Sequence, residues 1–141
     1  MTNGINFSIL LVDDDAEDRQ IIDEAFVEIG NACDIKKFIS GADLLNYLKN
    51  LEPELYPSLI VLDLTMPELN AIELLGILKQ NEAYKDIPVI VYSSHCTPSK
   101  KAELKALGAY DFIEKGDTMQ AIIDMAKRFT ALSKEQTRDV S

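Results

Sequence analysis

Apolar residues gather in five short runs along the chain, at residues 8–12, 34–39, 59–62, 89–92 and 110–113. Most of these runs are nearly continuous and do not alternate between apolar and polar positions. Continuous apolar runs of this length are typical of strands that are buried on both faces of a sheet. The pattern therefore predicts five buried strands.

The segments between the runs have the spacing of amphipathic helices. Within residues 16–29, apolar side chains recur every four positions from Ile21 to Ile29, and Gly30 follows as a stop signal. Four further helices are expected at 42–49, at 68–79, at 99–107 and from just after Asp117 to about residue 132. The expected start signals are Ser40, Pro67, Thr97 with Pro98, and Asp117 in a capping-box arrangement with Gln120.

Strict alternation of strands and helices with short connections predicts right-handed crossovers and a parallel sheet that helices cover on both faces. The expected fold class is α/β, a three-layer sandwich with a doubly wound five-stranded sheet and five helices. In such folds ligands bind at the carboxyl ends of the strands. The groups that follow the strands are Asp13 and Asp14, Asp63, Ser93 and Ser94, and Lys115. Acids, hydroxyls and one lysine are thus expected at one edge of the sheet.

Three carboxylates at one edge indicate a site for a hard divalent cation, because Mg²⁺ prefers oxygen ligands. Acids near a helix start are also stabilised by the helix dipole, so Asp13, Asp14 and Asp15 have a purely capping interpretation as well. Beside a bound cation, an aspartate can act as a nucleophile and form an acyl phosphate. Lys115 and Ser93 would then supply a positive charge and a donor to the phosphoryl oxygens.

Composition narrows the functions that such a site can serve. The 141 residues, 47% of them hydrophobic, suffice for one core, so we expect a single domain over residues 1–141. A formal net charge of -10 argues against binding to nucleic acid or to an anionic membrane. No apolar stretch approaches the ~18 residues of a membrane span, and the N-terminus does not resemble a secretion signal, so we expect a cytoplasmic protein. Cys33 and Cys96 lie far apart without a metal-binding pattern, which favours small buried hydrophobes.

Four pieces of the chain carry a family resemblance: LLVDDD, LIVLDLTMPELNAIELL, IPVIVYSSH and YDFIEKGD. In this order and at these distances they resemble the receiver domain of two-component response regulators, over about residues 8–132, with a polar tail at 133–141. The resemblance implies a flavodoxin-like sheet with the strand order 2-1-3-4-5. It also implies a phosphoprotein of two-component signal transduction, which accepts a phosphoryl group from a sensor histidine kinase or a histidine phosphotransfer protein.

The resemblance further implies a role for each residue that matches a motif. Asp63 is the phosphoacceptor; Asp13, Asp14, Asp63 and the backbone carbonyl of Thr65 hold Mg²⁺; Ser93 follows the phosphate, Lys115 pairs with it, and Phe112 is the switch aromatic. The implied signal is a population shift, read by a downstream protein at the face of the fourth helix, fifth strand and fifth helix. We expect phosphorylation from a phosphodonor and slow autodephosphorylation, and no turnover of small substrates.

Two departures from the family pattern keep a second function open. Gly116 follows Lys115 where the family usually has a proline in a cis peptide, so we expect a trans peptide or a more mobile loop. Asn70 and Ala71 replace the usual Asp-Gly, so that turn must form without glycine. The alternative function is a pseudo-receiver, a binding module that uses the same surfaces without phosphorylation. A flavodoxin-type flavin protein is less favoured because the acidic loop DDDAED repels phosphate, as is a phosphatase, whose catalytic acids are normally a spaced pair.

Overall fold

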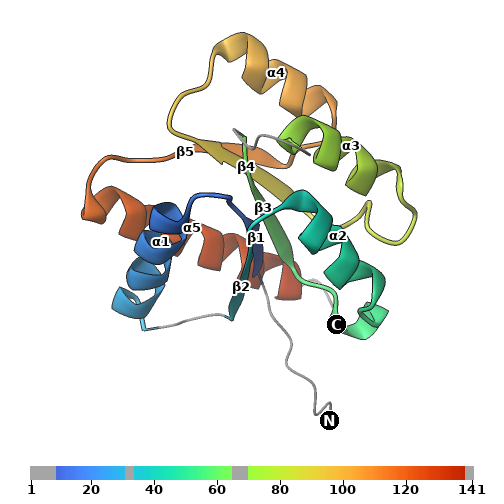
Figure 1. Ribbon diagram of the computed structural model, residues 1–141, viewed down its shortest axis with the longest axis horizontal. Helices are drawn as coiled ribbons and strands as arrows, with labels where there is room; N and C mark the ends of the chain where they lie inside the picture. The colour runs from blue at the N-terminus through green and yellow to red at the C-terminus, as the bar shows by residue number, and fades with distance from the viewer. Residues whose placement is uncertain (1–8, 31–33, 65–69, 139–141) are drawn as a thin grey trace.

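The computed structural model of the chain describes residues 9–30, 34–64 and 70–138. They form a five-stranded parallel sheet in the order β2-β1-β3-β4-β5, which confirms the predicted topology (Figure 1). The strands are β1 (Ile9–Val12), β2 (Ile35–Phe38), β3 (Leu59–Asp63), β4 (Val89–Ser93) and β5 (Asp111–Glu114). Each strand begins and ends within one residue of its predicted run.

Helices cover both faces of the sheet. They are α1 (Ala16–Glu28), α2 (Gly41–Lys49), α3 (Ala71–Gln80), α4 (Pro98–Ala106) and α5 (Met119–Arg138), with a short 3₁₀ turn η1 (Pro53–Leu55) after α2. α1 and α5 lie against one face, and α2, α3 and α4 lie against the other (Figure 1). The three-layer α/β sandwich is therefore confirmed. In the described part of the chain, no helix is long and apolar enough to cross a membrane.

Alternation of side chains along the strands divides the core into two halves. Leu10 and Val12 of β1 face the cluster beneath α2, α3 and α4, whereas Ile9 and Leu11 face the cluster beneath α1 and α5. All four side chains are fully buried, which explains why the strand sequences are continuous apolar runs. In β4, Tyr92 belongs to the α1/α5 half, so its side chain and the helix α5 share one side of the sheet.

Polar side chains begin several helices as the sequence predicted. Ser40 caps α2 and Thr97 caps α4, each by accepting a hydrogen bond from a backbone N–H of the first turn. Asp15 caps α1, because its carboxylate accepts from the N–H groups of Glu17 and Asp18. The capping interpretation of the acidic run therefore holds for Asp15.

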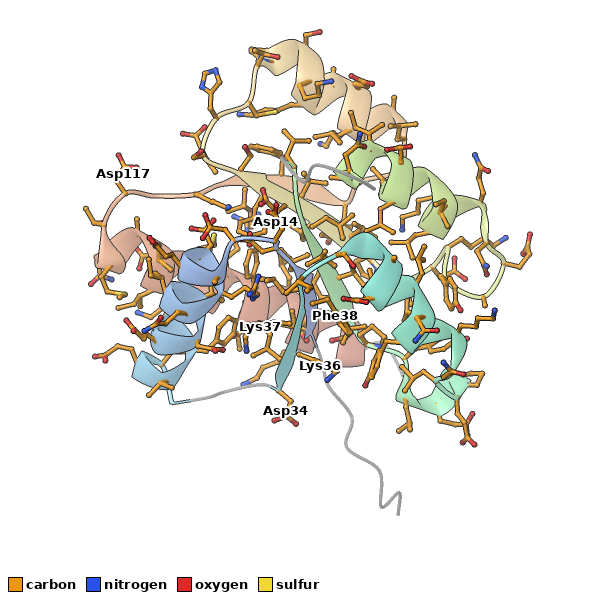
Figure 2. All side chains as sticks on the ribbon, viewed as in Figure 1. Asp14, Asp34, Lys36, Lys37, Phe38 and Asp117 are labelled. Atoms are coloured by element: carbon orange, nitrogen blue, oxygen red, sulfur yellow. The ribbon has the colours of Figure 1, made fainter. Side chains whose placement is uncertain are left out.

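Helix α5 differs from its prediction at both ends. Its first turn is capped by Thr118 and not by Asp117, since Oγ1 of Thr118 accepts the N–H of Ala121 at 3.1 Å. Asp117 instead projects away from the molecule (Figure 2). At the other end α5 continues to Arg138, past the predicted end near residue 132, and Ser133 is buried at 1% exposure. Part of the predicted polar tail is therefore helical.

Helix α3 shows how the chain makes a turn without the expected glycine. It begins at Ala71, and Asn70 forms a capping box with Glu73: the Asn70 side chain accepts the Glu73 N–H, and the Glu73 side chain accepts the Asn70 N–H. The predicted start signal, Pro67, lies outside the described residues. The departure at residues 70 and 71 thus has a local structural solution.

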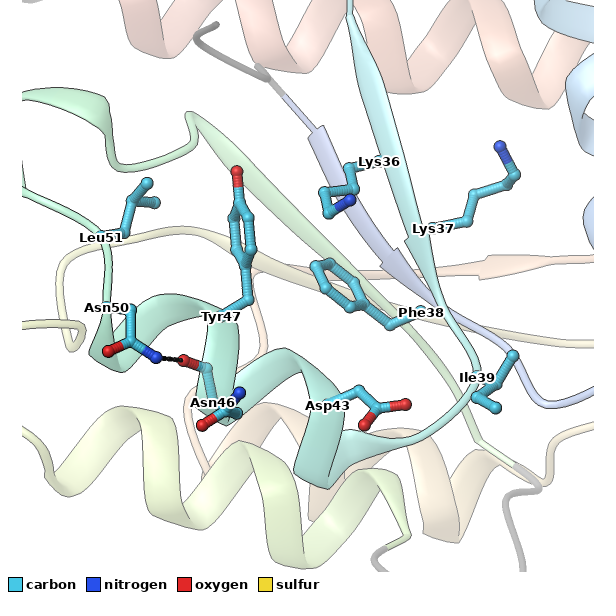
Figure 3. A pocket seen from close by; sticks show the side chains of 9 residues that line it. All are labelled: Lys36, Lys37, Phe38, Ile39, Asp43, Asn46, Tyr47, Asn50 and Leu51. Atoms are coloured by element: carbon cyan, nitrogen blue, oxygen red, sulfur yellow. Dashed lines mark hydrogen bonds between the residues drawn. The ribbon is translucent and has the colours of Figure 1, made fainter. Parts of the chain in front are cut away.

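A groove borders the edge strand β2 on the side of α2 (Figure 3). It is lined by Lys36, Lys37, Phe38, Ile39, Asp43, Asn46, Tyr47, Asn50 and Leu51. The Lys36 ammonium lies 5.7 Å from the ring centre of Phe38 and 5.5 Å from that of Tyr47, so cation–π contacts cover the aromatic part of the groove. The strand-end groups that the sequence singled out lie elsewhere.

Candidate functional site

The acids that follow β1 and β3 meet at the carboxyl edge of the sheet. β1 and β3 pair in parallel with Val12 opposite Leu62, so the next residues, Asp13 and Asp63, come side by side. One carboxylate oxygen each of Asp13, Asp14 and Asp63 lies within 4.8 Å of the others. Asp13 and Asp63 are buried, at 0% and 3% exposure, and Asp14 is exposed. The structure thus brings the three predicted carboxylates together.

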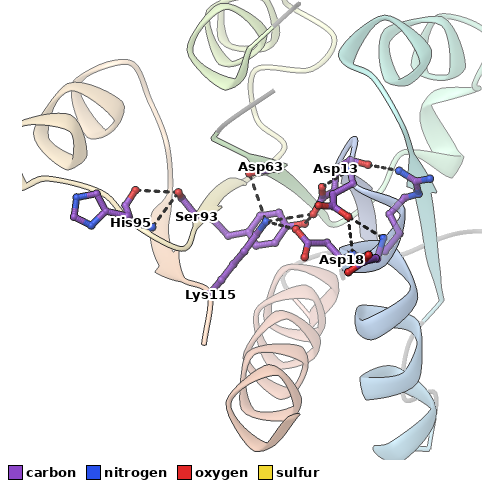
Figure 4. A network of polar contacts seen from close by, with 10 residues as sticks. Asp13, Asp18, Asp63, Ser93, His95 and Lys115 are labelled. Carbon is purple, nitrogen blue, oxygen red and sulfur yellow. Dashed lines mark hydrogen bonds and ion pairs between the residues drawn. The ribbon is translucent and has the colours of Figure 1, made fainter. Parts of the chain in front are cut away.

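Donors hold both carboxylate oxygens of Asp13. Oδ1 accepts the N–H of Asp15 at 2.9 Å, and Oδ2 accepts the Tyr92 hydroxyl and the Lys115 ammonium, the latter at 3.4 Å (Figure 4). Burial raises the pKa of Asp13 above its usual value, and the charge of Asp63 adds to the rise. The Tyr92 hydroxyl, the Asp15 N–H and the Lys115 charge oppose it. The ionised form of Asp13 therefore depends on the positive charge and donors around it.

Lys115 brings a positive charge to this pocket from the loop after β5. Its ammonium nitrogen lies 2.8 Å from a carboxylate oxygen of Asp18, 3.4 Å from Asp13 and 3.6 Å from Asp63 (Figure 4). Burial alone lowers the pKa of Lys115, but the hydrogen bond to Asp18 and the charges of Asp13 and Asp63 outweigh it, so the pKa is raised. Lys115 is therefore charged at neutral pH and lies beside the predicted phosphoacceptor.

The acids form the kind of site that hard cations occupy. All three candidate ligands are carboxylates, without a histidine or cysteine among them. Two of them are buried, and neighbouring buried carboxylates repel one another when ionised unless a positive charge lies close by. Lys115 supplies one positive charge, which it also shares with Asp18. A divalent cation such as Mg²⁺ fits the three carboxylate ligands, and it would offset the negative charge that Lys115 does not neutralise.

Ser93 ends β4, but its hydroxyl is engaged away from the acids. Oγ donates to the carbonyl of His95 at 3.0 Å and accepts the N–H of His95 at 3.3 Å (Figure 4). A hydroxyl has a single hydrogen, so in this conformation the Ser93 donor is committed to the His95 carbonyl. The side chain is 2% exposed, so any move toward Asp63 is a rotation within a packed site.

The other two predicted positions have different outcomes. Phe112 of β5 is partly buried at the border of the cluster beneath α2, α3 and α4, and the Lys101 ammonium lies 5.2 Å from its ring centre. Thr65, the predicted backbone ligand, lies outside the described residues. The pocket therefore contains Asp13, Asp14, Asp63 and Lys115, while Ser93 and Phe112 contact partners outside it.

Two residues of the pocket were not predicted from the sequence, Tyr92 and Asp18. Tyr92 belongs to an apolar run, yet its hydroxyl donates to Asp13 and the Lys115 ammonium lies 4.4 Å from its ring centre. Burial raises the pKa of Tyr92 far above its usual value, so the hydroxyl stays protonated and remains a donor. For Asp18 the available signal is its place in the first turn of α1, three residues after Asp15. For Tyr92 the signal is its place one residue before the strand end.

Gly116 follows Lys115 and lies close to Ala121 of α5. Among the described residues no peptide bond is cis, so the Lys115–Gly116 bond is trans. A Cβ added to Gly116 would meet the Cβ of Ala121 at 2.1 Å, well inside normal contact distance. Glycine at this position therefore allows the first turn of α5 to pack against the loop that carries Lys115.

Comparisons with known proteins agree on one family. The family model described as the response regulator receiver domain matches residues 9–127. A protein-glutamate methylesterase/protein-glutamine glutaminase of Clostridium acetobutylicum is 38% identical over 109 residues, which cover 76% of this chain and 30% of that protein. The two-component response regulator ARR7 of Arabidopsis thaliana is 33% identical over 115 residues, which cover 76% of this chain and 54% of that protein. The chain thus spans about a third to a half of these relatives' length.

Solved structures have the same fold. The phosphorylated cyanobacterial phytochrome response regulator RcpA matches with a TM-score of 0.76 at 25% identity, over 88% of this chain and 91% of that one. The receiver domain of the Francisella response regulator 1452 matches with a TM-score of 0.73 at 28% identity, over 92% of this chain and 98% of that one. Since the family match includes every strand of the sheet, the chain belongs to the receiver domain family of two-component response regulators.

Proposed function

We propose that the chain accepts a phosphoryl group on Asp63 and passes the signal to another protein. The observation that carries this proposal is the setting of the Asp63 carboxylate, which is buried, shares the 4.8 Å cluster with Asp13 and Asp14, and lies 3.6 Å from the Lys115 ammonium. A nucleophile between a cation site and a lysine suits phosphoryl transfer, because that reaction depends on positive charge around the phosphoryl oxygens.

Asp13, Asp14, Asp63 and the backbone carbonyl of Thr65 are the proposed ligands of Mg²⁺. When bound, Mg²⁺ supplies positive charge to the phosphoryl oxygens and offsets the repulsion among the acids. Receiver domains bind Mg²⁺ at an acidic pocket, and the three clustered carboxylates of this chain fit such a pocket. The carboxylate cluster supports the proposal most directly, since Thr65 lies outside the described residues.

The transfer step follows from the positions of Asp63 and Lys115. A carboxylate oxygen of Asp63 attacks the phosphorus atom and forms a bond to it, while the bond to the leaving group breaks and its electron pair stays on that group. Lys115 is already charged, so it can pair with a phosphoryl oxygen without first gaining a proton. The proposed donor is a phosphorylated histidine on a sensor histidine kinase or a histidine phosphotransfer protein, since this chain has a single histidine, His95.

The proposed output begins when Ser93 turns toward the phosphoryl group. To do so, its hydroxyl must release the carbonyl of His95. The proposed output surface is the face of α4, β5 and α5, on which Phe112 is partly buried and Arg128 of α5 pairs with Asp111 of β5 at 2.7 Å. A change at Ser93 would shift the population of Phe112 conformations and so change what a partner protein meets. A cytoplasmic location belongs to the same proposal.

The two departures that favoured a pseudo-receiver are accommodated by the fold. Asn70 replaces the missing glycine turn with a capping box, and Gly116 follows Lys115 through a trans peptide. Neither departure removes a side chain from the acidic pocket. The structure therefore favours the phosphoacceptor over the pseudo-receiver.

Intact-mass measurement after incubation with acetyl phosphate and Mg²⁺ tests the proposal. We expect the wild type to gain the mass of one phosphoryl group and Asp63→Asn to gain none. Asp124→Asn, which changes an exposed acid of α5, is the matched control and is expected to behave as wild type. A folded wild-type protein that binds Mg²⁺ but gains no mass would contradict the proposal and favour the pseudo-receiver, as would partner binding that Asp63→Asn leaves unchanged.

A further inference from the structure

Tyr92 contacts three parts of the site from the face of the sheet that α1 and α5 cover. Its side chain is fully buried, its hydroxyl donates to Oδ2 of Asp13, and the Lys115 ammonium lies 4.4 Å from its ring centre. Its backbone pairs with the phosphoacceptor strand: the Tyr92 and Asp63 Cα positions are opposite each other, and the Tyr92 carbonyl accepts the N–H of Leu64 at 2.9 Å. One residue thus contacts a metal-ligand candidate, the lysine and the acceptor strand.

Packing fixes the orientation of this tyrosine. The ring meets Phe129 of α5 edge-on, with ring centres 6.2 Å apart and planes at 86°. Phe129 is itself fully buried, so the ring of Tyr92 has one well-defined place between α5 and the pocket. A phenylalanine at this position would fill nearly the same volume. The hydroxyl adds little volume to the core, and it contributes the hydrogen bond to Asp13.

We propose that Tyr92 is a positioning residue, whose hydroxyl orients the Asp13 carboxylate for Mg²⁺ and whose ring face holds the Lys115 ammonium beside Asp63. The proposal rests on the proposed function, since it assigns a role in the same Mg²⁺ and phosphorylation site. It concerns a residue that contacts a candidate metal ligand and the lysine of the site.

The Asp15 N–H and the Tyr92 hydroxyl bind different oxygens of the Asp13 carboxylate. The N–H of Asp15 binds Oδ1 at 2.9 Å, and the Tyr92 hydroxyl binds Oδ2, so together they set the plane of the carboxylate. Without the hydroxyl, Oδ2 keeps the longer contact to Lys115 at 3.4 Å, and that lysine also has Asp18 as a closer partner. The Asp15 N–H would then be the closest donor left to the carboxylate, which would be held less firmly against rotation about its Cβ–Cγ bond. Partners that orient metal ligands typically contribute about 10–100-fold to metal affinity.

Mg²⁺ titration by isothermal calorimetry on the wild type, Tyr92→Phe and Tyr84→Phe tests the role of the hydroxyl. Tyr84 is the matched control, because it is a partly buried tyrosine that packs on Tyr56 before β4 begins, at the opposite end of that strand. We expect Tyr92→Phe to weaken Mg²⁺ binding about tenfold or more and Tyr84→Phe to leave it unchanged. A loss of less than about threefold in a Tyr92→Phe protein with a wild-type melting profile overturns the proposal.

The Mg²⁺ dependence of phosphorylation separates positioning from a general structural effect. Phenylalanine keeps the ring beside Lys115, so the rate at saturating Mg²⁺ is expected to stay within about threefold of wild type. The Mg²⁺ concentration for half-maximal rate is expected to rise in parallel with the dissociation constant. A lower saturating rate with unchanged Mg²⁺ dependence overturns the proposal.

NMR on the wild-type protein gives a third test that needs no substitution. In the wild type with isotope-labelled tyrosine, Mg²⁺ is expected to shift the ring resonances of Tyr92 and to leave those of Tyr84 in place; an unshifted Tyr92 overturns the proposal. The same measurements distinguish failure of the proposed function from failure of the positioning role of Tyr92. Mg²⁺ binding that depends on Tyr92 without phosphorylation of Asp63 would remove the proposed function alone, and absence of Mg²⁺ binding by the wild type would remove both.

Discussion

The proposed site has two halves, the acidic pocket and the neighbouring positions Ser93 and Phe112, and they are held in different ways. In the first half, Asp13, Tyr92 and Lys115 contact one another directly, and Lys115 reaches Asp63 as well. In the second half, Ser93 donates to a backbone carbonyl of its own loop, and Phe112 packs at the border of a core cluster under a lysine. Under the proposed function, the first half has its charges and donors in place before a phosphoryl group arrives, whereas the second half has to exchange partners.

This difference separates the reaction from the signal. Preorganised charges and donors stabilise a transition state without reorganising when the reaction occurs. A conformational signal has the opposite requirement, because it needs two arrangements with different contacts to the phosphoryl group. Substitutions in the first half should therefore change the rate of phosphorylation, and substitutions in the second half should change the response to it.

The largest effect is expected from Lys115→Met, which removes the ammonium that lies 3.6 Å from the Asp63 carboxylate. We expect phosphorylation by acetyl phosphate to slow about 10²–10³-fold, the range seen when one donor to a developing charge is removed. The initial rate of mass gain at saturating Mg²⁺ is the measurement. Lys100→Met is the control, because Lys100 pairs with Glu103 on the surface of α4. A decrease of less than about tenfold would mean that the first half is not organised as described.

A smaller effect, on stability, is expected from Asp13→Asn. Burial raises the pKa of Asp13, so its contribution to stability is present below the unfolded value, about 3.9, and is lost as the pH rises through the raised folded value. Above the raised pKa the metal-free wild type carries an unfavourable charge that asparagine removes. We expect the variant to melt a few degrees higher at pH 7 in a chelator, and the difference to shrink toward pH 4.

Thermal melts between pH 4 and pH 8, with and without Mg²⁺, check this. Mg²⁺ should stabilise the wild type and have little effect on Asp13→Asn, since the cation offsets the same charge. Asp124→Asn, an exposed change on α5, should show neither the gain nor the loss. A variant that melts below the wild type at pH 7 in the chelator would show that the pocket already neutralises Asp13.

The smallest effect on the reaction is expected from Ser93→Ala. The Ser93 hydroxyl contacts the His95 loop and not the reacting group, so phosphorylation should stay within about fivefold of the wild-type rate. The conformational response to phosphorylation should decrease more. The backbone amide resonance of Phe112 should shift on phosphorylation in the wild type and much less in the variant. A rate loss as large as that of Lys115→Met would remove the distinction between the two halves.

Much of this fold is predictable because buried strands have apolar residues at consecutive positions of the sequence. β1 has core on both of its faces, so Ile9 to Val12 form one apolar run, and its end at Asp13 marks the edge where the site forms. Ser40 and Thr97 are equally local signals, since a cap bonds to the turn that follows it. Asp117 and Thr118 are adjacent and both of a type that caps helices, so residue type alone does not decide between them; in the structure Thr118 accepts the N–H of Ala121.

The contacts inside the pocket are less predictable because they join distant segments. Tyr92 and Asp13 are 79 positions apart, and an apolar run gives no sign that a hydroxyl within it meets a carboxylate. The direction of the Ser93 hydroxyl is a rotamer choice, which the residue type leaves open. Motif spacing therefore predicts which groups gather at the edge, and the structure adds how each one is held.

The close approach of Gly116 to Ala121 also limits how this sequence can diverge. A side chain at position 116 would need the space that the Ala121 methyl group now fills, because the two Cβ positions would be 2.1 Å apart. Proline, the residue usual in the family, would occupy the same space and more. Positions 116 and 121 must therefore change together, and transplanting the loop of another receiver without its α5 would separate residues that fit only as a pair.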